Sequence, residues 1–184
     1  MANLKLKNPA GGSLNFVSAD GASDLTVTFP ATTGTAMVSG NMPAFSAYAN
    51  ASQSITANII TKVAINTEIF DTNNNFDSTT NYRFTPTVAG YYQINGTVRG
   101  TGTAVTAVIS NLYKNGASYA SGAQLAVTNP PYALQATFNE IIHLNGSTDY
   151  VELYGAVYAT SGTTFDYAIT DYTSRFSGCL VRGA

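Results

Sequence analysis

Apolar and polar residues alternate along this chain in short runs that are separated by Gly, Asn, Pro and Ser. Leu25, Val27 and Phe29, for example, alternate with threonine, and a period of two places alternate side chains on one face of a β-strand. No ten-residue window carries apolar residues at helical spacing with suitable caps. The longest helical candidate, residues 104–113, is rich in Thr, Val, Ile and Tyr, which favour strands. The pattern predicts an all-β protein.

Turn signals divide the chain into many short strands. Asn115-Gly116 follows an apolar run and is typical of a two-residue β-hairpin. Asn145-Gly146 marks a second turn, and Asn129-Pro130-Pro131 marks an irregular loop. Strands are predicted over residues 44–49, 61–66, 82–86, 90–99, 105–114, 134–144, 150–159 and 174–182. This number of short strands, joined by such turns, indicates a two-sheet jelly-roll β-sandwich.

The first 42 residues differ from the rest of the chain. They contain two strand-like pieces, residues 13–17 and 24–30, separated by a glycine-containing turn. A piece of this size cannot close a hydrophobic core alone, so it must pack on the rest of the chain, on partner chains or on both. We therefore predict a β-rich stem or attachment segment over residues 1–42 and a jelly-roll head domain over residues 43–184.

Charge is scarce, which limits the partners of this chain. Charged residues make up 10% of the 184 residues, with eight Lys and Arg, ten Asp and Glu, and a net charge of −2. The basic residues are scattered, so no nucleic-acid partner is expected. So little charge is typical of chains that hide much of their surface in subunit contacts.

Signals for export, membrane insertion or disulfide formation are not found. The charged start of the chain is not followed by the apolar run of a signal peptide, and no stretch approaches the roughly 20 apolar residues of a membrane span. Cys179 is the single cysteine, which excludes an intrachain disulfide. We expect the chain to be made and folded in a cytoplasm, without membrane insertion.

Five stretches of the predicted head follow one another in the order seen in a known family. They read IFDTNNNFD (69–77), FTPTVAGYYQI (84–94), LYKNG (112–116), TDYVEL (148–153) and RFSGCLV (175–181). The series resembles the globular head of complement component one q, which shares its jelly roll with the tumour-necrosis-factor superfamily. The resemblance covers essentially residue 43 to the C-terminus. It implies a homotrimer in which three heads pack about a threefold axis.

The same resemblance assigns faces to alternating residues. Tyr92 and Ile94 would form one row and Tyr91 and Gln93 the opposite one. Residues 176–181 are apolar on both faces. They would form a central strand that the sandwich covers on one side and neighbouring subunits cover on the other.

The first segment resembles a different class of protein. It carries no Gly-X-Y period of a collagen stalk. Residues 25–38, LTVTFPATTGTAMV, resemble repeats of bacteriophage tail-fibre and neck-fibre proteins, in which short pieces rich in Thr and Gly close on a Gly-Thr dipeptide. This resemblance implies a virion protein, located in a tail fibre or capsid fibre, whose N-terminal segment binds other virion structural proteins.

Three features suggest metal binding or catalysis, and each has a simpler interpretation. Residues 71–77 begin like an EF-hand loop, but Phe76 stands where Gly is required and Tyr82 where a bidentate Glu belongs; a turn held by its own Asn and Asp side chains is favoured. His143 is the only histidine, and the chain lacks the Gly-x-Ser-x-Gly motif that holds a catalytic serine, so a structural histidine is favoured. Cys179 lies in an apolar strand and is expected to be a buried free thiol. No acid pair stands out for glycoside cleavage, so we expect no enzyme, no metal and no cofactor.

The tyrosine residues are the main candidates for contacting a ligand. The tyrosine ring offers an apolar plate and a hydroxyl, which suits both sugar faces and protein epitopes. Residues 158–172 interleave Tyr with Asp, Thr and Ser, as a ligand-contacting loop would. The alternative is that these rings pack in the core and in subunit seams. The candidate ligand-binding residues are Tyr119, Tyr132, Tyr158, Asp166, Tyr167, Asp171 and Tyr172.

These observations predict a non-enzymatic receptor-binding protein of a bacterial virus. Its trimeric head would contact a host-surface glycan or outer protein during adsorption, with avidity from three identical sites. Two alternatives remain: a structural protein that decorates a capsid or neck, and a cellular complement-like lectin or adhesion module.

Overall fold

The computed structural model describes residues 3–7, 9–11, 13–17, 42–128, 132–166 and 173–184. The chain divides into two compact units, Met1–Gly34 and Thr35–Ala184. In the first unit β1 (Asn3–Lys7) pairs antiparallel with β2 (Ser13–Val17), which lies where a strand was predicted. The strand predicted over residues 24–30 lies outside the described residues. The stem boundary after residue 42 stays a prediction, because residues 18–41 are not described.

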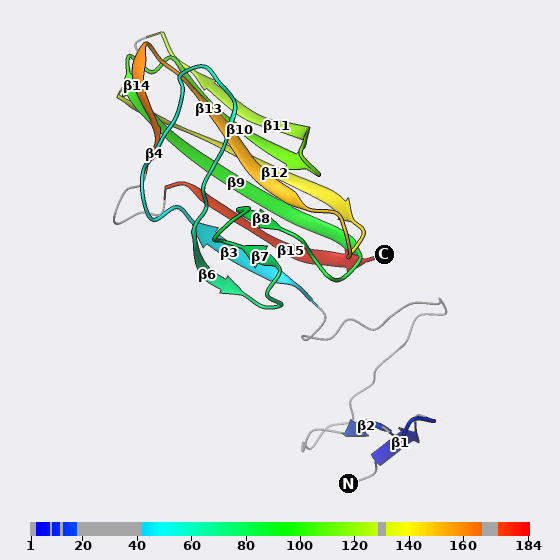
Figure 1. Cartoon of the computed structure of the whole chain (residues 1–184). Helices are drawn as coiled ribbons and strands as arrows, with labels where there is room; N and C mark the ends of the chain where they lie inside the picture. Colours follow the sequence, from blue (N-terminus) through cyan, green and yellow to red (C-terminus); the bar gives the residue numbers. More distant parts are fainter. Residues whose placement is uncertain (1–2, 8, 12, 18–41, 129–131, 167–172) are drawn as a thin grey trace, which may run out of the picture. The chain divides into compact units, whose positions relative to one another are not determined.

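The second unit, called the head below, contains strands and no helix among its described residues (Figure 1). In the same part of the chain there is accordingly no helix with the length and apolar character of a membrane-spanning segment. The strands of the head are β3 (Ala44–Tyr48), β4 (Gln53–Ser54), β5 (Thr61–Lys62), β6 (Thr67–Asp71), β7 (Phe76–Asp77), β8 (Arg83–Phe84), β9 (Gly90–Thr103), β10 (Ala107–Lys114), β11 (Ala117–Ala126), β12 (Ala133–Leu144), β13 (Val151–Tyr158), β14 (Ser161–Phe165) and β15 (Arg175–Gly183).

Two antiparallel sheets make up the head. The first, called the β9 sheet, has the order β4-β14-β9-β15-β3-β6, and β12 pairs along the other edge of β9. The second, called the β10 sheet, has the order β11-β10-β13-β8-β7, with β5 also paired to β13. The jelly-roll β-sandwich predicted from the sequence is confirmed.

Strand β9 is central to the first sheet, because it pairs with β12, β14 and β15. Its side chains alternate between the core and the outer face, so that Tyr92, Ile94 and Val98 are buried while Tyr91 is exposed. Strand β15 lies between β9 and β3 and turns Phe176 and Leu180 inward. The predicted rows on β9 and the central position of residues 176–181 are therefore confirmed.

Aromatic rings fill the core between the sheets. Phe45 stacks on Phe84 with ring centroids 4.3 Å apart and on Phe76 at 5.0 Å, and Phe176 meets it edge-on at 5.2 Å. All four side chains are buried. Such offset and edge-on pairs add about 0.5–1.5 kcal/mol each to the area that they bury.

Two of the three Asn-Gly pairs, Asn115-Gly116 and Asn145-Gly146, lie in turns that require positive φ, whereas Asn95-Gly96 lies within β9. Asn115 and Gly116 have φ of 52° and 77°, the type I′ pattern, and join β10 to β11 as predicted. Gly146 has φ of 70°, and a Cβ there would lie 2.3 Å from the backbone nitrogen of Ala89. Only glycine fits that position without a backbone shift.

Two predicted strands are shorter than expected. The strand predicted over residues 61–66 is limited to β5, and that over residues 82–86 is limited to β8. Val63 and Ile65 are nevertheless fully buried, so the alternation there reflects inward packing without extended strand pairing. Strands β1, β4, β6, β7, β11 and β14 were not predicted.

Candidate functional site

Two predicted ligand-binding residues flank the connection between β9 and β10. The Gly102 amide donates to the Tyr132 carbonyl at 3.1 Å, and the Thr106 amide donates to the Tyr158 carbonyl at 2.7 Å. Tyr132 is 73% exposed, the largest exposed fraction among the large hydrophobic side chains described. This connection, Tyr132 and the β13–β14 connection form one end of the head, called the distal tip below.

The distal tip lies far from the point where the chain enters the head. The Pro43 carbonyl accepts from the Leu180 amide, and Leu180 pairs with Tyr92 near the start of β9. The tip lies at the other end of β9, at Thr103. Tyr92 and Thr103 are eleven positions apart along this strand, a distance of about 36 Å at roughly 3.3 Å per residue.

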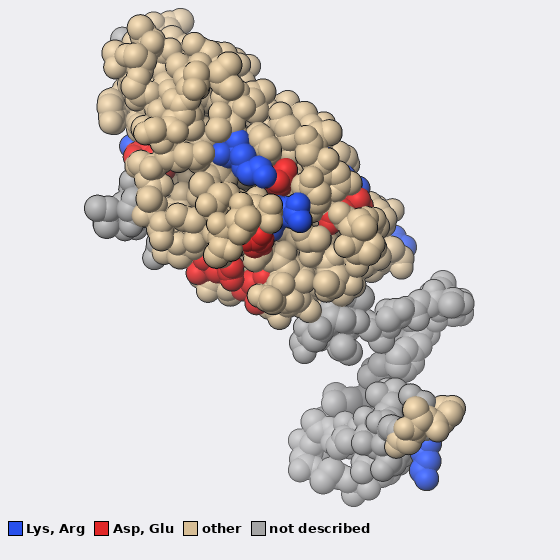
Figure 2. Space-filling view, viewed as in Figure 1, with Lys and Arg blue, Asp and Glu red and all other residues tan. Residues whose placement is uncertain are grey.

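The distal tip is made from uncharged stretches of sequence. No charged residue occurs in residues 100–113, 115–139 or 153–165, which supply the connections and strand ends there. Figure 2 shows the same distribution on one face of the head: basic and acidic side chains lie over its middle and lower parts, and the end that carries β14 is free of them. The tip therefore offers hydroxyls, amides and aromatic rings.

The other predicted binding residues do not join this end. Asp166 forms an ion pair with Arg99 and accepts a hydrogen bond from the Ser52 hydroxyl at 3.2 Å. These contacts give Asp166 a structural role. Tyr119 is half exposed on β11, close to the Asn115-Gly116 turn. Tyr167, Asp171 and Tyr172 lie outside the described residues, so their role stays a prediction.

The outer face of the β9 sheet is a second candidate surface, because large apolar side chains are exposed on it. Tyr91, Ile141 and Val181 are 44%, 53% and 55% exposed on it. Cys179 is also exposed, so the expectation of a buried thiol is wrong for the single chain. Residue 179 belongs to the outward row of β15, the row for which the sequence predicted cover from neighbouring subunits.

His143 lies on the same outer face and has a packing role there. Its ring meets the Tyr91 ring edge-on, with centroids 5.3 Å apart. Its backbone carbonyl accepts a hydrogen bond from Lys114 Nζ at 2.8 Å. No group of three or more His, Cys, Asp or Glu side chains suited to a metal ion occurs in the described residues.

A polar cleft of about 540 Å³, called the β6–β8 cleft below, opens beside β6, β7 and β8. Figure 2 shows acidic side chains gathered over β6 and β7 and basic ones beside them. None of the predicted binding residues lines this cleft. The signal in the sequence was the Asn-rich run 71–77, which was interpreted only as a turn. The lining residues are Glu68, Asn74, Asn75, Phe76, Asp77, Ser78, Thr79, Arg83, Thr85 and Thr87.

The Asn-rich run is held by its own side chains, as predicted. The two carboxylate oxygens of Asp71 accept from the amides of Asn73 at 3.2 Å and Phe76 at 2.6 Å. Asn74 has φ of 54°, a left-handed conformation that asparagine tolerates. The Asn75 side-chain oxygen accepts from the Thr87 amide at 3.3 Å. These bonds fix one wall of the β6–β8 cleft.

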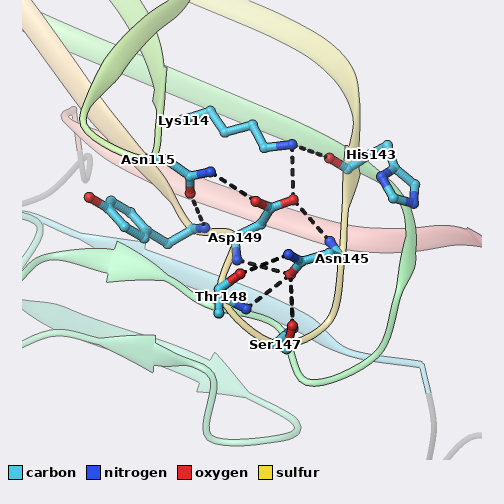
Figure 3. A network of polar contacts seen from close by, with 8 residues as sticks. Lys114, Asn115, His143, Asn145, Ser147, Thr148 and Asp149 are labelled. Atoms are coloured by element: carbon cyan, nitrogen blue, oxygen red, sulfur yellow. Dashed lines mark hydrogen bonds and ion pairs between the residues drawn. The ribbon is translucent and has the colours of Figure 1, made fainter.

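A polar network ties the two Asn-Gly turns together (Figure 3). Asp149 accepts from the Asn115 amide group at 2.8 Å and from Lys114 Nζ at 3.0 Å. The Asn145 side-chain oxygen accepts from the amides of Ser147, Thr148 and Asp149 at 2.9–3.0 Å. The hydrogen bond from Asn115, followed by those from Lys114 and the Asn145 amide, holds the pKa of Asp149 below its usual value.

Acid is expected to weaken the fold through Asp149 and Asp77. Hydrogen bonds, the largest from the Thr80 amide, hold the pKa of Asp77 well below its usual range. Both carboxylates stabilise the fold fully above their unfolded pKa of about 3.9, and this stability is lost as the pH falls towards their lower folded values. Urea titrations at pH 7, 5 and 3 should show the largest loss in free energy of unfolding between pH 5 and 3. An Asp77→Asn, Asp149→Asn double variant should have a flatter profile; an equal loss in the variant would contradict the assignment.

The head has the jelly-roll fold of the complement-one-q and tumour-necrosis-factor structures. The chain is similar to the globular domain of zebrafish complement 1qA protein, at 18% identity and a TM-score of 0.54, over 77% of this chain and 99% of that chain. It is also similar to murine APRIL (8% identity, 76% and 99% covered, TM-score 0.53) and to Eiger TNF from S. frugiperda (9%, 78% and 93%, 0.55). No family model matches the chain, and no curated protein matches it. At these identities the likeness shows the fold.

Proposed function

We propose that the chain is a non-enzymatic fibre head of a bacterial virus, whose distal tip contacts a glycan or protein of the host surface. The observation that carries the proposal is the uncharged tip with its exposed Tyr132, at the end of the head opposite Pro43. A head that is anchored through its N-terminal side presents this end to the host. Aromatic and hydroxyl groups recognise saccharides and protein epitopes without needing charge.

Three chains form the working unit in this proposal. The outer face of the β9 sheet exposes Tyr91, Ile141 and Val181, and large exposed apolar side chains on one face mark interaction surfaces. The structures that share the fold support three-fold association. A trimer would cover this face, including Cys179, and would present three tips at once, which multiplies weak single contacts into avidity.

The N-terminal segment would join the trimer to other virion structural proteins, in a tail fibre or capsid fibre. Support comes from the resemblance of residues 25–38 to tail-fibre and neck-fibre repeats. The chain would assemble in the host cytoplasm before it enters the virion.

Labelled full-length protein applied to a panel of bacterial strains tests the function. We expect it to stain one group of strains and to compete with adsorption of the virus that infects them. Binding to capsids with no staining of cells would favour the decorating role instead. Binding to animal cells or secreted proteins would favour the complement-like module, and release of reducing sugars would contradict the non-enzymatic assignment.

Tyr132→Ala is expected to lower cell staining at least tenfold, because exposed aromatic rings dominate the binding energy of small contact surfaces. Tyr119→Ala is the matched control: it removes the same ring from a half-exposed site outside the tip. Flow cytometry with equal concentrations of the labelled proteins measures both. Equal loss in the two variants, or loss only in Tyr119→Ala, would place the contact away from the tip.

A further inference from the structure

We infer that the β6–β8 cleft binds an uncharged, hydroxyl-rich saccharide unit. The inference rests on the proposed function, since it names one class of ligand on a host surface, but it uses residues outside the distal tip. The volume of the β6–β8 cleft, about 540 Å³, falls within the roughly 300–1,000 Å³ of small-molecule sites. Phe76 is its one apolar lining residue and is itself buried, so the cleft does not suit a lipid or other apolar ligand.

The walls of the cleft are rigid before any ligand arrives. Asp77 accepts hydrogen bonds from the Thr79 and Thr80 amides at 3.0 and 2.9 Å, and from the Asn81 amide and side chain at 3.1 and 2.7 Å. Glu68 accepts from the Ser78 hydroxyl at 2.6 Å. Together with the Asp71 and Asn75 bonds, these contacts lock the turn and the β7–β8 loop. A preformed wall lowers the ordering cost of binding a weakly held ligand such as a sugar.

Several groups in the cleft remain available to a ligand. Among the described residues, the side chains of Asn74, Thr85 and Arg83 make no hydrogen bond or ion pair. Asn74 is exposed at the rim, while Arg83 and Thr85 are half-buried. An amide and a hydroxyl each donate and accept, and a guanidinium donates through a planar fork. A sugar ring, whose neighbouring hydroxyls both donate and accept, satisfies such a mixed set.

The charges of the cleft favour a neutral sugar over an acidic one. Glu68 and Asp77 oppose the single positive charge of Arg83, which gives the lining one excess negative charge. The Asp77 carboxylate is already saturated by its own loop. The Arg83 guanidinium lies over the Tyr150 ring, 4.3 Å from the centroid, which orients it as a donor. A carboxylated sugar placed against Arg83 would also meet the Glu68 carboxylate.

Saturation-transfer NMR with the full-length protein tests the site. The probes are methyl glycosides of glucose, galactose, mannose and N-acetylglucosamine, with N-acetylneuraminic acid as the acidic comparison. We expect transfer to at least one neutral glycoside. Its affinity should fall at least fivefold in Asn74→Gly, which removes the side chain and keeps the left-handed backbone, and in Arg83→Met, which keeps the stem and removes the guanidinium.

Asn58→Gly is the matched control, because Asn58 is also exposed, has φ of 64° and lies outside the cleft. It should bind like the unmodified protein. The inference is overturned if only the acidic sugar shows transfer, if no neutral glycoside does, or if both cleft variants bind normally. If host cells are still stained in that case, the proposed function stands without this site; if no strain is stained by the unmodified protein, the proposed function itself fails.

Discussion

Lysine in place of Ile141 is expected to dissociate the proposed trimer into monomers of 19.3 kDa. Ile141 lies on β12 opposite Gln93, which in turn pairs with Cys179. It therefore lies at one end of a row that crosses three strands of the outer face, with Gln93 in the middle and Cys179 at the other end. A lysine buried in a contact between such faces would lose its hydration without a carboxylate partner, and an unpaired buried charge is strongly destabilising.

Ile59→Lys provides the matched control. Ile59 is 54% exposed and Ile141 is 53% exposed, so the two substitutions change equally accessible side chains, but Ile59 precedes β5, outside the β9 sheet. Sedimentation velocity over a range of concentrations should give trimers for Ile59→Lys and monomers for Ile141→Lys, with the same β-rich far-ultraviolet dichroism. A persistent Ile141→Lys trimer would exclude this face as the subunit contact, and a monomeric unmodified protein would exclude the trimer.

The local pattern of apolar and polar residues was sufficient to predict a strand where that strand buries one face. Residues 90–99 alternate so clearly that the prediction of β9 and of its inward row was correct. The Asn115-Gly116 turn was equally predictable, because two consecutive residues with positive φ require Asn, Asp or Gly. Such features depend on near neighbours in the chain.

Strand β11 shows where local pattern fails. Its sequence, ASYASGAQLA, is rich in Ala, Ser and Gly and has little strand propensity. It forms a strand because the type I′ turn returns it antiparallel to β10. Its Gly122 fits closely there: a Cβ would lie 2.5 Å from the Phe138 Cβ. Neither the pairing nor this proximity is visible in residues 117–126 alone.

The candidate site was only partly predictable for the same reason. Tyr132 and Tyr158 were selected for their chemistry, and the fold places both at the β9–β10 connection. Asp166 was selected for its place in a polar run, yet its carboxylate pairs with Arg99, a residue 67 positions earlier on a neighbouring strand. The β6–β8 cleft was missed because its walls come from separate turns that meet only in the folded head.

Phe45 is expected to be the most sensitive single position of the head. Its side chain is 1% exposed and contacts the rings of Phe84, Phe76 and Phe176, which come from both sheets. Replacing a buried phenylalanine by alanine removes its transfer free energy and leaves a cavity, which together cost about 3–5 kcal/mol. Since small domains are stable by only about 5–15 kcal/mol, Phe45→Ala should leave a marginally folded head.

Urea denaturation at one fixed protein concentration, followed by near- and far-ultraviolet dichroism, measures this loss. Tyr132→Ala removes a ring of similar size from a site that is 73% exposed and should change the free energy of unfolding by less than about 0.5 kcal/mol. The aromatic cluster joins β3 of the β9 sheet to β7 and β8 of the β10 sheet, so its loss should lower the stability of both sheets together. If Phe45→Ala unfolded at the same urea concentration as Tyr132→Ala, the two sheets could not be held together by this cluster.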